Sequence, residues 1–147
     1  EEFLDEQSLQ CTPEAAGDFQ RWSMRSLTVL QGNFFDLSSQ LCGPVNCAWD
    51  RAALVAIRPA ERPRYVEKLV ELLGSGARIL LVGWDAPRSA DVGPPYRLTR
   101  GEVSSLFETS GRVERVHTER QTPETSERVA SKGLDWVQIE AYRITLR

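Results

Sequence analysis

A strand, an amphipathic helix and a second strand follow one another between residues 45 and 84. The helix is expected from about residue 60 to residue 73, because apolar side chains recur at the helical period and two glycines follow: Tyr65, Val66, Leu69, Leu72 and Leu73, then Gly74 and Gly76. Two strands joined through a helix run parallel, so residues 45–49 and 77–84 predict a parallel βαβ unit. The chain is therefore predicted to be an α/β protein. Residues 77–84 are almost all apolar, which is typical of a central strand buried on both faces.

Polar and aromatic residues follow the ends of three predicted strands. The strands at 27–31, 45–49 and 78–83 lead respectively into Asn33-Phe34-Phe35-Asp36, Asp50-Arg51 and Trp84-Asp85. Ligands of open α/β sheets bind beyond the carboxyl ends of the strands. If these strands are parallel neighbours, their ends line one edge, and that edge is the candidate active site.

The beginning of the chain offers weaker signals. Residues 1–8 have helical composition, and residues 11–24 have neither the helical nor the strand period, so we expect a loop there. The apolar run at 52–57 is expected to be helical and to end before Pro59.

The end of the chain predicts a helix and an antiparallel strand pair. Thr99 and Glu102 have the spacing of a capping box at the start of a helix. A weak strand is expected at 112–118, then a polar segment at 119–132 and a strand at 136–146. The apolar phase of that last strand slips at Ala141-Tyr142, which predicts a bulge or a change of buried face. Only a loop is expected between these two strands, so they should pair antiparallel.

Composition limits the partners of this chain. At 147 residues it is expected to be a single domain, and its 41% hydrophobic and 27% charged residues are ordinary for a globular protein. The net charge of -3 argues against nucleic acid or an anionic membrane as partner. Three cysteines without zinc-ligand spacing indicate free thiols, no metal and a cytoplasmic location. The only histidine, His117, lies away from the strand ends and is expected on the surface.

Several segments resemble the thiopurine S-methyltransferase family in their residues and in their order, over nearly the whole chain. The matching segments are Gly32 to Leu37, Trp49 to Ile57, Pro59 to Arg62, Arg64-Tyr65, Gly93-Pro94-Pro95-Tyr96, Gly133 to Asp135 and Glu140 to Tyr142. The resemblance implies the Rossmann-like fold of class I methyltransferases, with strand order 3-2-1-4-5-7-6 and an antiparallel last strand. The strands predicted here would be the third to the seventh. The first two strands, with the glycine-rich turn that meets the cofactor, have no counterpart, so we interpret the chain as amino-terminally truncated.

The same resemblance implies roles for individual residues. Asn33 and Phe34 match positions that meet the adenine of S-adenosylmethionine, although Phe34, like Phe35, would also serve in a core. Asp50 and Arg51 fall at the cofactor side of the site, where Asp50 is expected to orient rather than react. Arg51 also faces the substrate and would favour a thiolate, the reactive form of a thiol. An ion pair of Arg51 with Asp50 or Asp36 is the structural alternative.

Three further residues are implied on the substrate side. Arg128 matches a second substrate-side arginine, although its sequence context alone suggests a solvated loop charge. Pro94 and Pro95 would wall the pocket, and a cis bond before either is left open. Trp84 would either pack over the ligand or cap the core.

The implied activity is S-methylation of aromatic and heterocyclic thiols by direct displacement, with S-adenosylmethionine as cofactor and no certain catalytic residue. A monomer is expected for the full-length form, and the truncated chain alone is expected to lack activity because the glycine-rich motif is absent. Two alternatives are a halide or thiol methyltransferase of the same superfamily, and a truncated fragment that binds neither ligand.

Overall fold

The computed structural model describes residues 11–87 and 93–147, and the chain divides into two compact units, Glu1–Gly43 and Pro44–Arg147. Each unit is described by itself below. The predicted helix at 1–8 lies outside the described residues. That the whole chain forms one domain stays a prediction.

The described part of the first unit is a small antiparallel sheet followed by two short helices. Its strands are β1 (Glu14–Ala16), β2 (Phe19–Ser23) and β3 (Thr28–Gln31), in the order β1-β2-β3. The prediction of a loop at 11–24 is therefore wrong. Gly17, with φ of 62°, and Asp18 form the turn between Ala16 and its partner Phe19, and Phe19 and Trp22 are buried. A two-residue Gly-Asp turn is a hairpin signal, although the residues around it have neither the helical nor the strand period.

The strand predicted at 27–31 exists as β3, but its pairing differs from the expectation. β3 pairs antiparallel with β2, whereas a parallel place beside the other strands was expected. The 3-10 helix η1 (Phe34–Asp36) follows it, and α2 (Ser39–Cys42) closes the unit. Only two of the three strand ends thus share a sheet in the described structure.

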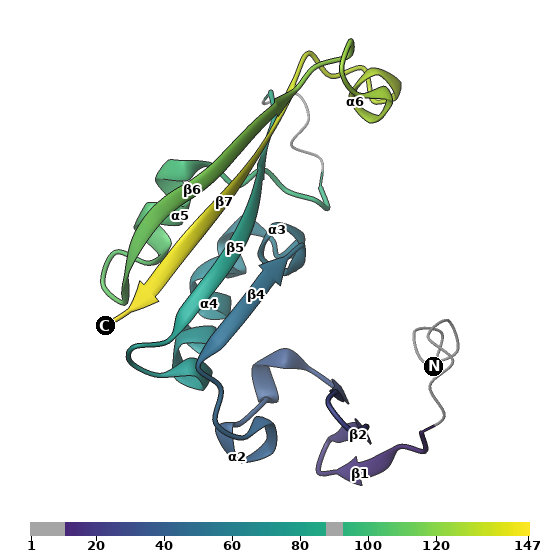
Figure 1. Ribbon diagram of the computed structural model, residues 1–147, viewed down its shortest axis with the longest axis vertical. Coiled ribbons are helices and arrows are strands. Elements are labelled where there is room, and N and C mark those ends of the chain that lie inside the picture. The colour runs from purple at the N-terminus through teal and green to yellow at the C-terminus, as the bar shows by residue number, and fades with distance from the viewer. Residues whose placement is uncertain (1–10, 88–92) are drawn as a thin grey trace. The chain divides into compact units, whose positions relative to one another are not determined.

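The second unit is built on a four-stranded mixed sheet in the order β4-β5-β7-β6 (Figure 1). The strands β4 (Cys47–Arg51) and β5 (Arg78–Asp85) are parallel and are joined through α3 (Ala53–Ala56), the 3-10 helix η2 (Pro59–Glu61) and α4 (Arg62–Leu73). The last strand, β7 (Val137–Leu146), runs antiparallel to both β5 and β6 (Gly111–Gln121). The prediction of a Rossmann-like α/β sheet with an antiparallel carboxy-terminal strand is confirmed.

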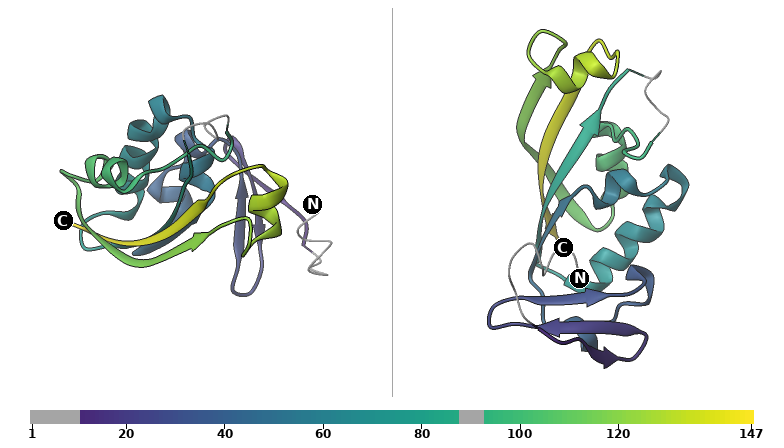
Figure 2. Two further views of the ribbon diagram at one scale, coloured as in Figure 1. Left: turned by 90° about the horizontal axis from the view of Figure 1, so that it is seen from above. Right: turned by 90° about the vertical axis from the view of Figure 1, so that its right-hand side faces the viewer.

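Helices α4 and α5 (Arg100–Leu106) lie on one face of this sheet (Figure 2). The predicted capping residue Thr99 accepts a hydrogen bond from the Glu102 N–H at 3.3 Å and begins α5. The core lies between these helices and the sheet and includes Leu69, Ile79, Leu81, Val103, Phe107 and Ile144. Burial of this apolar layer is the main force that holds the helices on the sheet.

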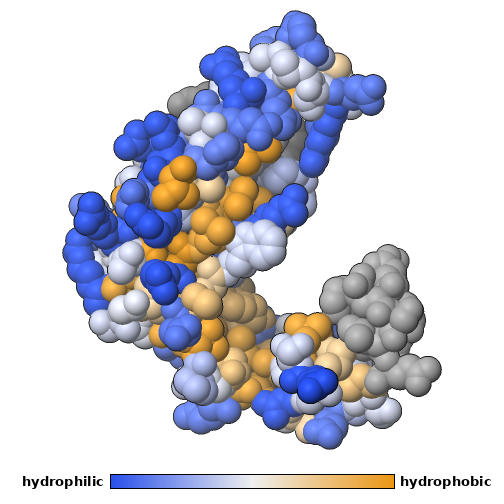
Figure 3. Space-filling model, in the orientation of Figure 1, coloured by the Kyte–Doolittle hydropathy of each residue, from blue (hydrophilic) through white to orange (hydrophobic). Residues whose placement is uncertain are grey.

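The opposite face of the sheet remains open, which corrects the expectation for the strand at 77–84. Ile79 and Leu81 are buried under the helices, but Leu80 between them is 44% exposed, and Trp49 on β4 is 70% exposed. Figure 3 shows apolar side chains gathered on this face. A continuous apolar run indicates that both faces of a strand carry apolar side chains. It does not indicate whether other elements pack against both faces.

The closing hairpin contains the predicted irregularity on the partner strand. The register shifts between Arg115 and His117 of β6, opposite Tyr142 and Ala141 of β7. The segment at 119–132 was expected to be a polar connection, but it contains the end of β6 and the helix α6 (Glu127–Ser131). Val129 explains this helix, because it is buried against Ala86 and Val137.

Glu140 of β7 is a buried carboxylate that should make stability depend on pH. Burial raises its pKa, but hydrogen bonds from Tyr142 Oη and from Arg115 Nη1, the latter at 2.7 Å, outweigh burial and hold the pKa below its ordinary value. A carboxyl group whose pKa is depressed by folding stabilises the protein above its unfolded pKa. That contribution is lost as the pH falls through the folded pKa.

Replacement Glu140→Gln should therefore flatten the loss of stability as the pH falls below about 4.3. Urea unfolding followed by circular dichroism at several acidic pH values measures the effect. Glu67→Gln, at an exposed position of α4, is the matched control and should keep the wild-type pH dependence. An identical acid response in Glu140→Gln would show that another carboxylate is responsible.

Candidate active site

The carboxyl ends of β4 and β5 lie side by side at one edge of the sheet. Arg51, the last residue of β4, is opposite Val82 of β5, and β5 continues through Trp84 to Asp85. The edge therefore brings together two acidic residues, an arginine and a tryptophan, as predicted from the sequence.

Asp50 is buried, and its carboxylate is bound on both oxygens. Oδ1 accepts from the Leu54 N–H at 3.1 Å, which fixes the first turn of α3, and Oδ2 accepts from Tyr65 Oη at 2.9 Å. Burial and the adjacent Asp50 carboxylate raise the pKa of Tyr65 well above its ordinary value. Tyr65 therefore remains a hydrogen-bond donor at neutral pH, which excludes it as a general base.

The second acidic residue of the edge is also paired. Asp85 Oδ1 accepts from Arg97 Nε at 2.9 Å and Nη2 at 2.8 Å, and it also accepts from the Ala86 N–H. Both carboxylates at the ends of β4 and β5 are thus held in local hydrogen bonds. Their negative charge is balanced or buried at this edge.

Arg51 is exposed, and it takes part in none of the ion pairs found among residues 11–87 and 93–147. Within the second unit, the alternative of an ion pair between Arg51 and Asp50 is therefore not observed, and the alternative with Asp36 of the first unit stays a prediction. Ala52 follows with φ of 94°, an unfavourable conformation for a residue with a Cβ. The bond from Asp50 to Leu54 spans this turn, so Asp50 helps to fix the backbone next to Arg51.

The Gly93-Pro94-Pro95-Tyr96 loop is tied to the same region. The Tyr96 N–H donates to Val55 O at 2.7 Å, and both proline bonds are cis, Gly93–Pro94 and Pro94–Pro95. A Cβ on Gly93 would lie 2.3 Å from the Tyr96 ring, so this close approach requires glycine. Pro94 is exposed and Pro95 is half-buried.

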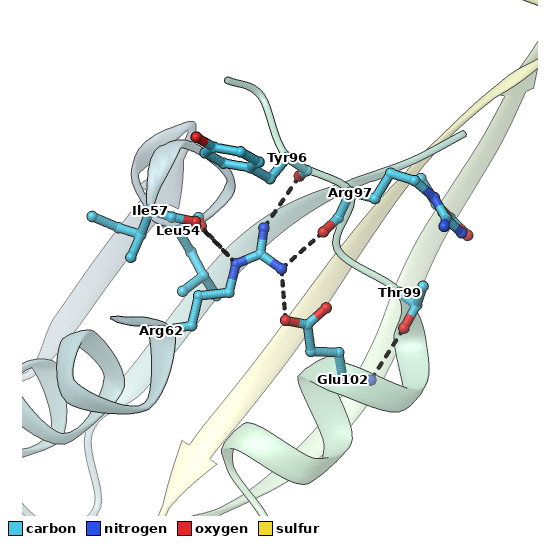
Figure 4. A network of polar contacts seen from close by, with 8 residues as sticks. Leu54, Ile57, Arg62, Tyr96, Arg97, Thr99 and Glu102 are labelled. Atoms are coloured by element: carbon cyan, nitrogen blue, oxygen red, sulfur yellow. Dashed lines mark hydrogen bonds and ion pairs between the residues drawn. The ribbon is translucent and has the colours of Figure 1, made fainter. Parts of the chain in front are cut away.

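Arg62 joins this loop to α3, α4 and α5, and its side chain is fully buried (Figure 4). Its Nε donates to the carbonyl oxygens of Leu54 and Ile57, at 3.3 and 3.2 Å. Nη1 and Nη2 reach the carbonyl oxygens of Arg97 at 2.8 Å and Tyr96 at 3.3 Å, and Nη1 also pairs with Glu102 at 2.6 Å. Arg62 was not predicted to have a role of its own, although it falls on the buried stripe of α4, three and four residues before Tyr65 and Val66.

Arg128 belongs to α6, beyond the carboxyl end of β5. It lines a cavity of about 50 Å³ together with Trp84, Lys132 and Gln121. Trp84 also packs against the buried cluster of Ala86, Val129 and Val137, so it both caps this cluster and faces the cavity. Lys132 was not predicted as a site residue, although its spacing of four residues from Arg128 indicates a shared helix face.

Asn33 and Phe34 belong to the first unit. Asn33 Oδ1 accepts from the Phe35 N–H at 3.2 Å and caps η1, and its Nδ2 donates to Asp36 at 2.7 Å. The rings of Phe34 and Phe35 meet edge to face at 5.9 Å, and both are half-buried. A half-buried aromatic beside a capped turn retains a partly accessible face for a planar ligand.

The remaining predictions concern thiols, metal and the single histidine. Cys11, Cys42 and Cys47 are free thiols, as predicted. His117 is exposed on β6, as expected. Within the described ranges the structure contains no group of three or more side chains placed to hold a metal ion. No described helix is both long and apolar enough to cross a bilayer.

Comparison with known proteins gives a consistent relationship. Residues 1–147 match the family model described as Thiopurine S-methyltransferase (TPMT). A thiopurine S-methyltransferase from Bordetella petrii is 33% identical over 145 residues, covering 98% of this chain and 65% of that protein. One from Methylococcus capsulatus is 32% identical over 143 residues, covering 97% of this chain and 64% of that protein. The chain thus spans slightly less than two thirds of the length of these relatives.

One solved structure supports the fold. A SAM-dependent methyltransferase from Methanosarcina mazei superposes with a TM-score of 0.51 at 15% identity, covering 77% of this chain and 64% of the other. At this identity the likeness concerns the fold alone.

Proposed function

Because the chain belongs to the thiopurine S-methyltransferase family, we propose that it contributes to methyl transfer from S-adenosylmethionine to the sulfur of an aromatic or heterocyclic thiol. The observation that supports a thiol acceptor most directly is the charge at the strand ends. Asp50 and Asp85 are bound to local partners, whereas Arg51 is exposed at the end of β4. An edge with engaged carboxylates and an exposed arginine attracts an anion, and a thiolate is an anion.

The residues of this chain fit part of the cofactor. Phe34 would offer an aromatic face to the adenine, and Asn33 would hold the turn beside it through its cap of η1. Asp50 would act by positioning, because its two oxygens already hold Leu54 and Tyr65. When bound, S-adenosylmethionine supplies an electrophilic methyl group.

The chain's own residues would bind and orient the acceptor. Arg51 would lower the pKa of the bound thiol and hold the sulfur as a thiolate, and Pro94 and Pro95 would form a wall of the pocket. Arg128 would bind the acceptor from α6. A thiolate needs no further base for displacement, so the high pKa of Tyr65 is compatible with this reaction.

Incubation of the chain with methyl-labelled S-adenosylmethionine and thiophenol tests the proposal. Labelled methyl phenyl sulfide, together with cofactor binding in a calorimetric titration at about the micromolar level, would support the proposal and would overturn the expectation that the chain alone lacks activity. Iodide in place of thiophenol is the control acceptor. Labelled methyl iodide without the sulfide would instead support a halide methyltransferase, and a folded chain that binds neither ligand would contradict any catalytic role for it alone.

The cysteines and the net charge suggest a cellular compartment and a class of acceptor for this activity. Three free thiols are suited to a reducing compartment such as the cytoplasm. A small-molecule acceptor, rather than nucleic acid or a membrane, is consistent with the net charge of -3. A monomeric full-length form stays a prediction.

A further inference from the structure

The cavity beside α6 has two cationic side chains on an otherwise largely apolar wall. Arg128 and Lys132 supply the charges, and Trp84, Val129, Val137 and Ile139 supply the apolar wall. Gln121 is the remaining lining residue, so no carboxylate lines the cavity. Among the described residues, neither Arg128 nor Lys132 takes part in an ion pair.

The spacing of the two cations is unfavourable without an anion. Arg128 lies in α6 and Lys132 follows four residues later at its carboxyl end, and like charges at this spacing repel. Lys132 is the carboxyl cap of α6, and its N–H donates to Ala130 O, so the backbone that carries Lys132 is fixed. Val129 of the same helix is buried, which holds this turn against β7. An anion between the two side chains would convert their repulsion into attraction.

The size of the cavity limits what it can receive. A volume of about 50 Å³ is about a third of the roughly 150 Å³ of an apolar cavity that binds benzene. This space is too small for a complete aromatic ring, but it accommodates a carboxylate. A ring attached to that carboxylate would extend past Trp84, whose aromatic surface suits such a neighbour.

We infer that this cavity binds a carboxylate substituent of the aromatic acceptor, and that Lys132 together with Arg128 selects acceptors that carry one. That the cavity binds an anion is inferred from the cavity alone. That this anion is a substituent of the methyl acceptor rests on the proposed function. The inference assigns different roles to Arg51 and to the pair of Arg128 and Lys132. Arg51 on β4 would serve the reacting sulfur, and the pair on α6 would serve the second acidic group.

Binding of benzoate tests this inference without any methyl transfer, because benzoate has no sulfur. We expect benzoate to shift the methyl resonances of Val129, Val137 and Ile139 in ¹³C-edited NMR spectra, and neutral benzamide to bind about tenfold more weakly. Lys132→Met should weaken benzoate binding by about tenfold and leave benzamide unchanged. Lys132→Arg should retain benzoate binding, because it keeps the charge.

The control variant is Lys68→Met on α4, whose side chain pairs with Glu71. It should bind benzoate like the wild type. Equal binding of benzoate and benzamide, an unchanged affinity in Lys132→Met, or shifts confined to other residues would each overturn the inference. If thiophenol is methylated but benzoate does not bind, this inference alone fails. If benzoate binds through Lys132 but no thiol is methylated, the proposed function fails and the anion site stands.

Discussion

Replacement of Arg62 by methionine is expected to lower the free energy of unfolding of the Pro44–Arg147 unit by about 3–5 kcal/mol. The guanidinium is fully buried, and it serves four carbonyl oxygens and the Glu102 carboxylate. Methionine fills a similar space but offers no donor. The carbonyl groups of Leu54, Ile57, Tyr96 and Arg97 would each lose a hydrogen bond in a part of the protein from which water is largely excluded.

The loss should be measurable as a lower urea midpoint in circular dichroism and as a lower melting temperature. A loss of this size is a large fraction of the roughly 5–15 kcal/mol that stabilises a typical domain. Arg58→Met is the matched control, because Arg58 is an exposed arginine four residues earlier and should change stability little. If the two variants unfold alike, the carbonyl groups around Arg62 do not depend on its donors.

Glu102→Gln separates the charge from the hydrogen bonds. The glutamate side chain is 31% exposed, so its neutralisation should cost much less than the loss of Arg62. The four carbonyl contacts would persist in Glu102→Gln. An equally large loss in both variants would assign the stability to the ion pair rather than to the carbonyl contacts.

The sequence was sufficient to predict those parts of the fold that depend on short-range patterns of apolar and capping residues. The stripe on α4 and the Thr99 cap of α5 are short-range patterns, and they predicted helices that the structure contains. The apolar run of β5 predicted a central strand, which is also observed. What covers the second face of that strand depends on distant segments. Leu80 is exposed although its neighbours in sequence are as apolar as those of a fully buried strand.

The site was predictable to the level of residue type and strand end. Asp50 and Arg51 were both placed at the end of β4, but their different surroundings were not predictable. Asp50 is buried because Tyr65, fifteen residues later, supplies a donor, and Arg51 points to solvent because neighbouring strand residues face opposite sides. The same limit applies to α6 and Lys132. Only the burial of Val129 against Ala86 and Val137 shows that this polar segment forms one wall of a cavity.

Arg51→Met is expected to reduce kcat/KM for thiophenol by about 10- to 100-fold at about pH 5, where most of the free thiol is protonated, if the chain transfers methyl as proposed. The physical reason is the loss of a fixed positive charge beside the sulfur. Without it the bound thiol should have a higher pKa, and a smaller fraction should be present as the reactive thiolate. Circular dichroism should show an intact fold, because Arg51 is exposed.

The pH dependence distinguishes this role from a general effect on binding. Free thiophenol is itself largely ionised above about pH 7, so the defect of Arg51→Met should shrink toward alkaline pH, and the rise of its kcat/KM should be shifted to higher pH than in the wild type. Arg58→Met should follow the wild-type profile. A defect of constant size across the pH range would mean that Arg51 binds the acceptor without favouring its thiolate. No defect at all would remove Arg51 from the site, and the anion would then have to be held by the cations of α6.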